Sequence, residues 1–144
     1  MTTTRKIMLL AFAIGDACRE LETGLYVANA TKEWLTPELL PAVVFVISSF
    51  IAFSTGTSWG TFAIMLAISV PMAGIHEANL TMVVAATLGG GIFGDHCSPI
   101  SDTSIISSMA SASDHIDHVK TQLPYALFGG IITTILYLII GFLS

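Results

Sequence analysis

The residues best suited to chemistry lie between Gly94 and Thr103, in the segment GDHCSPISDT. This segment follows an uncharged apolar stretch, residues 78–93. Carboxylates in apolar surroundings are costly, and they usually face the protein interior, a transport pathway or an ion. Their oxygens suit a small hard cation. The carboxylates of Asp95 and Asp102 are therefore the first candidates for an ion site.

Pro99 makes this segment more specific, because proline has no backbone N–H and interrupts a helix. The carbonyl of Asp95 loses its helical partner, and Ser98 is biased toward extended backbone. We therefore expect residues 78–110 to form a broken transmembrane helix, with free carbonyls beside Asp95 and Asp102. Helices broken in this way hold ions in many transporters. A polar loop between two ordinary helices is the alternative.

The composition indicates an all-α integral membrane protein in contact with lipid. Of the 144 residues, 53% are hydrophobic and 10% are charged, whereas about a quarter are charged in soluble domains. The mean hydropathy is +0.81. Acidic residues within or beside apolar stretches contribute to the net charge of −5, and nothing suggests a nucleic-acid partner. Both cysteines lie in expected membrane segments, so we predict no disulfide framework.

Residues 6–30 are expected to form the first helix. Asp16, Arg19 and Glu20 have spacings that place them on one helical face, where they could form an internal polar cluster. Asp16 and Glu20 are therefore secondary candidates for ion binding, although a short helix ending in a solvated loop is equally compatible. The basic and apolar start resembles a signal peptide, but the further apolar segments favour an uncleaved helix.

Residues 38–75 are expected to form a re-entrant helical hairpin. The uncharged run 39–75 would measure about 55 Å as one helix, against about 30 Å of hydrocarbon. Small and hydroxylated residues at 54–60 divide it into arms of about 22 Å, each too short to span. The expected tip consists of Thr55, Gly56, Thr57 and Ser58. Two short spans with a surface turn are the alternative.

The last part of the chain predicts a polar loop over residues 111–121 and a transmembrane helix over residues 122–143. If Arg5 and Lys6 are cytoplasmic, counting the crossings places the 111–121 loop with Lys120 on the cytoplasmic side as well. This arrangement agrees with the excess of basic residues in cytoplasmic loops.

The GDHCSPISDT segment, its continuation SDHIDHVKTQLPYA and the tip segment STGTSWG closely resemble the C-terminal part of NhaC-type Na⁺/H⁺ antiporters. The resemblance covers essentially the whole chain. It implies a multi-pass protein of a bacterial-type cytoplasmic membrane, built like one repeat of an inverted-repeat ion transporter. Complete members are longer and contain both repeats. We therefore expect a gene fragment, a truncated chain or one subunit of a split transporter, partnered by a first-repeat polypeptide or by further copies of itself.

The resemblance predicts sodium/proton antiport, with Na⁺ and H⁺ as transported ions, no cofactor and no enzymatic reaction. Exchange requires carboxylates that hold either ion, and we assign this role to Asp95 and Asp102, with Na⁺ bound between them. Ser98 and Thr103 are expected to add oxygen ligands, and the hydroxyls of the hairpin tip should face the site. His96 is a candidate proton carrier, because histidine titrates near physiological pH, or else a structural residue.

Other functions remain open on these residues. Sodium-coupled exchange of a small organic acid is one, because hydroxyl-rich tips beside helix N-termini can hold a carboxylate. A membrane zinc site is another, since zinc favours the ligand types offered at positions 95–97 and in the HIDH segment. An inactive remnant or an assembly subunit is the third. The residues considered for zinc are Asp95, His96, Cys97, His115 and His118.

Overall fold

The computed structural model describes the backbone of residues 2–143 and the side chains of residues 9, 10 and 12–143. All regular secondary structure in this part of the chain is helical, as expected, and it contains no strand. Three of its helices, α4, α5 and α7, are long and apolar enough to cross a membrane. The helices are α1 (Thr2–Glu20), α2 (Thr23–Thr31), α3 (Leu40–Thr55), α4 (Ser58–Ile75), α5 (Leu80–Cys97), α6 (Asp102–Ala110) and α7 (His115–Leu143).

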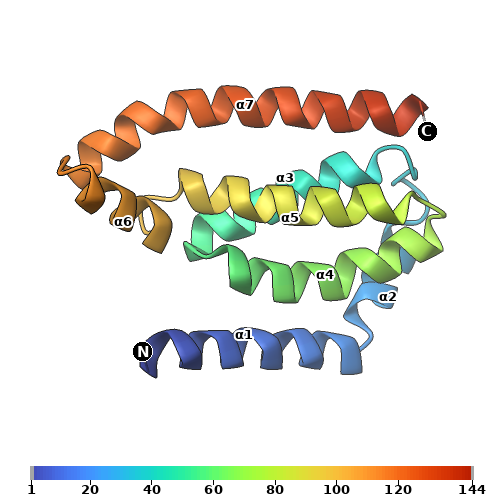
Figure 1. Cartoon of the computed structure of the whole chain (residues 1–144). Helices are drawn as coiled ribbons and strands as arrows, with labels where there is room; N and C mark the ends of the chain where they lie inside the picture. Colours follow the sequence, from blue (N-terminus) through green and yellow to red (C-terminus); the bar gives the residue numbers. More distant parts are fainter. Residues whose placement is uncertain (1, 144) are drawn as a thin grey trace.

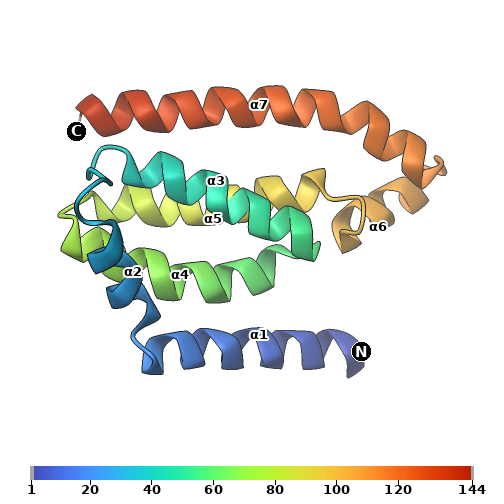
Figure 2. The ribbon, with the colours of Figure 1, turned by 180° about the vertical axis from the view of Figure 1, so that it is seen from behind.

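Helices α3, α4 and α5 form the centre of the molecule, with α1 and α7 on opposite sides (Figure 1, Figure 2). The α3–α5 crossing is the closest, because glycines of α5 face the backbone of α3. A methyl group on Gly90 would contact the carbonyl oxygen of Phe45, and one on Gly94 would contact that of Ser49. Small residues allow this approach without a steric penalty. The crossing therefore aligns α5 rigidly along α3.

Residues 6–30, expected as one helix, form two. α1 ends at Glu20, and Glu22 adopts a left-handed conformation with φ 50° before α2 begins. The change of direction lets α2 lie against α4, where a Cβ at Gly24 would be 2.8 Å from the carbonyl oxygen of Ala67. Tertiary packing against α4 thus overrides the continuous helix that local propensity favours.

The hairpin turn between α3 and α4 is shorter than predicted. Only Gly56 and Thr57 lie outside helices, whereas residues 54–60 were expected to be irregular. Thr55 is the last residue of α3 and Thr61 lies in the first turn of α4, and their hydroxyls donate to carbonyl oxygens four residues earlier. Gly56 makes the turn with φ 68°, a conformation that glycine adopts without strain. With 18 residues, or about 27 Å, α4 is long enough to be a candidate span, contrary to the expectation for both arms.

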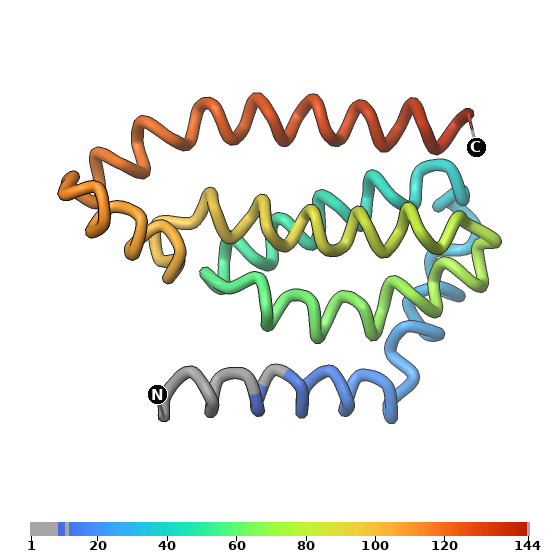
Figure 3. The backbone as a smooth tube through the Cα atoms, in the orientation of Figure 1, coloured from blue at the N-terminus to red at the C-terminus, as the bar shows by residue number. Residues whose placement is uncertain are grey.

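The expected interruption near Pro99 separates α5 from α6, and the chain then turns into α7 (Figure 3). α7 begins at His115, so most of the loop expected over residues 111–121 is helical. The cause is a cap: the Asp114 carboxylate accepts hydrogen bonds from the backbone N–H groups of Ile116 and Asp117, at 2.9 and 3.2 Å. Such a cap stabilises the first turn of a helix.

Candidate functional site

Asp95 lies in the last turn of α5 and is almost completely buried, with 4% of its surface exposed. Pro99 ends the helix there, and Ser98 takes the extended conformation typical of a residue before proline, with ψ 128°. The chain then folds back, so that the residues after Pro99 face the end of α5. A buried carboxylate is thereby placed beside the first residues of α6.

Two hydroxyl groups donate to the Asp95 carboxylate. Ser101 Oγ donates to Oδ1 at 2.7 Å, and Thr103 Oγ1 donates to Oδ2 at 3.1 Å. Ser101 also caps α6 by accepting a hydrogen bond from the N–H of Thr103 at 3.1 Å. The two hydroxyl oxygens themselves are 2.7 Å apart. Asp95, Ser101 and Thr103 therefore form a closed cluster of oxygen atoms.

Two of the carbonyls expected to be free at the break, those of Asp95 and His96, have partners. The N–H of Ser98 donates to the carbonyl oxygen of Asp95 at 3.1 Å, which replaces the bond that Pro99 cannot make. Ser104 Oγ donates to the carbonyl oxygen of His96 at 3.3 Å. Polar backbone groups rarely remain unpaired inside a protein, and here hydroxyls and a tight turn satisfy them. Ser98 is fully buried, and its hydroxyl accepts a hydrogen bond from the N–H of Ile100 at 3.4 Å, so it belongs to the turn after α5.

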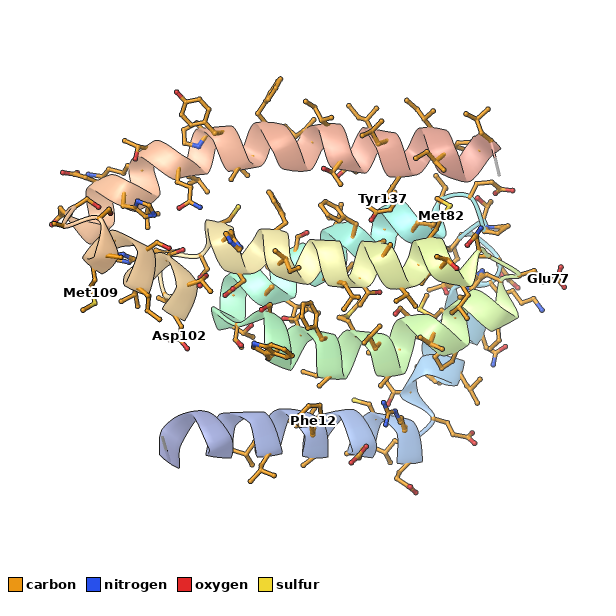
Figure 4. All side chains as sticks on the ribbon, viewed as in Figure 1. Phe12, Glu77, Met82, Asp102, Met109 and Tyr137 are labelled. Atoms are coloured by element: carbon orange, nitrogen blue, oxygen red, sulfur yellow. The ribbon has the colours of Figure 1, made fainter. Side chains whose placement is uncertain are left out.

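The second carboxylate of the expected pair lies elsewhere. Asp102 is exposed and projects from the start of α6 away from α5 (Figure 4). Its neighbour Ser101 faces Asp95 as the helix cap, and successive residues of a helix are turned by about 100° from each other. The structure thus joins Asp95 to Ser101, a residue not predicted for the site, in place of Asp102. A sequence signal for Ser101 does exist: it directly precedes a helix whose first residue is acidic, which is a typical position for a capping serine.

His96 is exposed and turned away from the Asp95 carboxylate. Its Nδ1 lies 2.9 Å from the carbonyl oxygen of Ile92, one turn earlier in α5. A carbonyl oxygen can only accept, so Nδ1 carries the hydrogen. This local bond is the kind made by a structural histidine.

The hairpin tip contacts the break through Gly56. A Cβ at Gly56 would be 2.9 Å from both the carbonyl oxygen and the Cγ1 of Ile100. The Thr55 hydroxyl instead donates to the carbonyl of Ile51 at 2.9 Å. Thr57 is the extended residue before α4, and Ser58 is the first residue of that helix. The tip therefore approaches the break closely, with backbone contacts in place of the expected hydroxyl contacts.

The secondary candidates on α1 are exposed. Arg19 and Asp16 form an ion pair of 3.2 Å, and both side chains line a cavity of about 260 Å³ between α1 and α4. Glu20 is also exposed. No group of three or more His, Cys, Asp or Glu side chains that could hold a metal ion occurs within the described residues. The geometry therefore provides no set of zinc ligands there.

Comparison with known proteins gives a consistent result. The model of the Na⁺/H⁺ antiporter family matches residues 1–142. The chain is 42% identical to an uncharacterised protein of Haemophilus influenzae over 94% of its own length and 26% of the relative's. It is 33% identical to the malate-2H⁺/Na⁺-lactate antiporter of Bacillus subtilis, over 77% of this chain and 24% of that protein. Identity to the Na⁺/H⁺ antiporter NhaC of Alkalihalophilus pseudofirmus is 32%, over 77% and 23% of the two chains.

The chain thus spans about a quarter of the length of these relatives. No solved structure matches it significantly.

Proposed function

This chain belongs to the Na⁺/H⁺ antiporter family, and from that membership we propose that it carries the ion-exchange site of a sodium/proton antiporter, centred on Asp95. The relatives named above with an assigned function are antiporters, and three helices within the described residues are candidate membrane spans. Na⁺ and H⁺ are the transported ions and compete for one carboxylate. The protein is a secondary transporter that lies, as a multi-pass protein, in the cytoplasmic membrane.

The observation that carries this proposal is a count of hydrogens around Asp95. Three contacts join its carboxylate, Ser101 Oγ and Thr103 Oγ1, at 2.7, 3.1 and 2.7 Å. Each contact needs one hydrogen, but two hydroxyl groups supply only two. With Asp95 ionised, both hydroxyls donate to the carboxylate and the contact between them lacks a hydrogen. A protonated Asp95 supplies the third hydrogen: the carboxyl group donates to one hydroxyl, that hydroxyl donates to the other, and the second donates to the remaining carboxyl oxygen.

A small cation satisfies the same oxygens in a different way. When Asp95 loses its proton, the carboxylate and the lone pairs of Ser101 and Thr103 are the hard oxygen ligands that such a cation prefers. The buried Ser98 hydroxyl, in the residue directly after the helix end, is available as a further neutral ligand. One cluster therefore accommodates either H⁺ or Na⁺ but not both, which is the requirement for exchange.

The arrangement of helices supports one repeat of an inverted-repeat transporter. In Figure 1, α7 extends past the tip of the α3–α4 hairpin toward the α6–α7 turn, and Gly56 at that tip lies against Ile100 in the break. This agrees with a re-entrant hairpin that meets the broken α5–α6 segment inside the membrane. Irregular backbone at that depth must be covered by protein or by a water-filled cavity.

Among the residues that the structure describes, none covers the face around the break. Ile100 is 60% exposed, and Asp102 and Thr103 are exposed as well. We therefore propose that a polypeptide carrying the first repeat, or another copy of this chain, packs against this face. The site is then complete only in the assembled transporter.

The test of the site is exchange by the assembled transporter in vesicles, with Asp95→Asn as the main variant. Asparagine keeps the shape of the side chain but holds neither a titrating proton nor a charge. We expect Na⁺-driven proton flux to be lost, while the protein remains inserted. Asp117→Asn, on the exposed first turn of α7, is the matched control and should retain exchange. Full exchange in Asp95→Asn with unchanged Na⁺ dependence would refute the proposal.

Sodium-coupled exchange of a small organic acid is the second candidate, favoured by the relative named a malate-2H⁺/Na⁺-lactate antiporter. The hydrogen bonds to the Asp95 carboxylate come from neutral hydroxyls of Ser101 and Thr103 and not from a basic group. A basic group would be expected to bind an organic anion, so this site favours the transport of cations only. Adding malate or lactate to the vesicles separates the two functions. Proton or Na⁺ flux that depends on the added acid would establish sodium-coupled exchange of an organic acid.

A further inference from the structure

Helix α6 is held in place mainly by polar contacts. Of its nine residues only Ser104 and Ser108 are buried, and the others are exposed. Such a helix has little apolar burial to fix its position. At its start, Ser101 and Thr103 bind the Asp95 carboxylate. What holds the other end of α6 therefore also influences the geometry at Asp95.

His115, the first residue of α7, connects that other end to the helix break. Its Nε2 lies 2.7 Å from the carbonyl oxygen of Pro99, and its Nδ1 lies 3.2 Å from Ser108 Oγ. The carbonyl can only accept, so Nε2–H donates to it. One half-buried imidazole thus joins α7, α6 and the 98–101 loop.

The Pro99 carbonyl lies on the outer, less restrained side of the 98–101 loop. Ser98 and Ser101, on either side of it, are fully buried, whereas Pro99 and Ile100 are exposed. Packing therefore fixes the inner side of the loop, while the bond from His115 restrains its outer side. Asp114, the residue before His115, caps the first turn of α7 and so holds His115 itself in position.

We propose that His115 is a positioning residue for the Asp95 site: by holding the Pro99 carbonyl it keeps the hydroxyl of Ser101 against the carboxylate. This role rests on the proposed exchange function. It differs from the zinc-ligand role considered from the sequence, because His115 donates to a carbonyl and contacts a hydroxyl.

Three substitutions separate the two nitrogen contacts. The amide nitrogen of His115→Gln reaches about as far as Nε2 and can still donate to the Pro99 carbonyl. The side-chain amide of His115→Asn is shorter: it reaches about as far as Nδ1 and can contact Ser108 but not the Pro99 carbonyl. His115→Ala makes neither contact. His118→Asn is the matched control, because His118 lies one turn further along α7 with a similar partial burial.

Two measurements apply to each variant in the assembled transporter. The first is the Na⁺ concentration that gives half-maximal proton flux, recorded separately from the maximal flux. The second is the alkylation rate of Cys97 by a membrane-permeant maleimide, in a Cys18→Ser background. Cys97 is the last residue of α5, is 5% exposed and lines a hollow with Leu123 of α7, so its reactivity reports loosening of the end of α5 against α7 without requiring transport.

We expect His115→Ala and His115→Asn to raise the half-maximal Na⁺ concentration by about threefold to tenfold, the factor for one lost hydrogen bond, and to accelerate Cys97 alkylation. His115→Gln and His118→Asn should resemble the parent in both. Equal behaviour of all variants, or impairment of Gln equal to that of Ala, would overturn the proposal. Faster alkylation with unchanged Na⁺ dependence would also overturn it. If the parent itself exchanges no Na⁺, the proposed function fails, whereas Cys97 alkylation still decides whether His115 holds the loop.

Discussion

Replacing Ser101 by alanine tests the Asp95 cluster most directly. The Ser101 hydroxyl donates to Asp95 Oδ1 at 2.7 Å and accepts from the N–H of Thr103 at 3.1 Å as the cap of α6. Thr103 makes the weaker contact to the carboxylate, at 3.1 Å, and is itself exposed. Ser101→Ala therefore removes a cap and a proposed ion ligand together, whereas Thr103→Val removes only a ligand and keeps the shape of the side chain.

The magnitudes follow from these contacts. Loss of a serine cap costs about 1 kcal/mol of stability. Loss of a hydrogen bond to a charged group costs about 1.5–3 kcal/mol, and about 1.4 kcal/mol corresponds to a tenfold change in affinity. If the hydroxyl contributes comparably to Na⁺ binding, Ser101→Ala should raise the half-maximal Na⁺ concentration by roughly tenfold to a hundredfold. For the exposed Thr103 we expect about threefold, because solvent competes there.

The assay combines Na⁺-driven proton flux in vesicles with thermal unfolding in detergent. Ser101→Ala should weaken Na⁺ dependence and lower Tm, and Thr103→Val should weaken Na⁺ dependence slightly at unchanged Tm. Ser107→Ala, at an exposed position of α6, should change neither quantity. A lower Tm for Ser101→Ala with unaltered Na⁺ dependence would mean that Ser101 serves only as a helix cap and not as an ion ligand. If Thr103→Val raised the half-maximal Na⁺ concentration more than Ser101→Ala, Ser101 would not make the stronger of the two contacts and the reasoning would be refuted.

Three further predictions concern the scaffold. Gly94→Ala should destabilise the protein by about 2–3 kcal/mol, because the added Cβ would contact the Ser49 carbonyl oxygen and lie 2.9 Å from the Cβ of Ala52; Gly129→Ala, with nothing within 4 Å, should unfold no earlier than the parent. Cysteines at Thr36 and Glu77, at the base of the hairpin, should both react with an impermeant thiol reagent from one side of the membrane, and labelling from opposite sides would contradict a re-entrant hairpin. In mild detergent the chain should associate with a first-repeat polypeptide or with itself, and a folded, monodisperse monomer would argue against the proposed cover.

Features governed by neighbouring residues could be predicted from the sequence. Pro99 removes an N–H wherever it stands in a helix, so the end of α5 was predictable. The uncharged final segment likewise predicts a membrane helix, because its composition alone decides that property. The GDHCSPISDT segment also indicates the correct family, because its ten residues are contiguous and their order alone carries the resemblance.

Other features depended on contacts between distant parts of the chain. The split between α1 and α2 follows from the packing of Gly24 on α4, a contact between residues far apart in the sequence. Spacing along the sequence favoured Asp102 as the partner of Asp95, but the side-chain direction depends on rotation about the axis of α6. In the structure Ser101 caps α6 and binds the Asp95 carboxylate, whereas Asp102 does not face it. The sequence by itself therefore determined where the helix breaks and that a carboxylate lies there, whereas the tertiary structure decided which oxygens surround it.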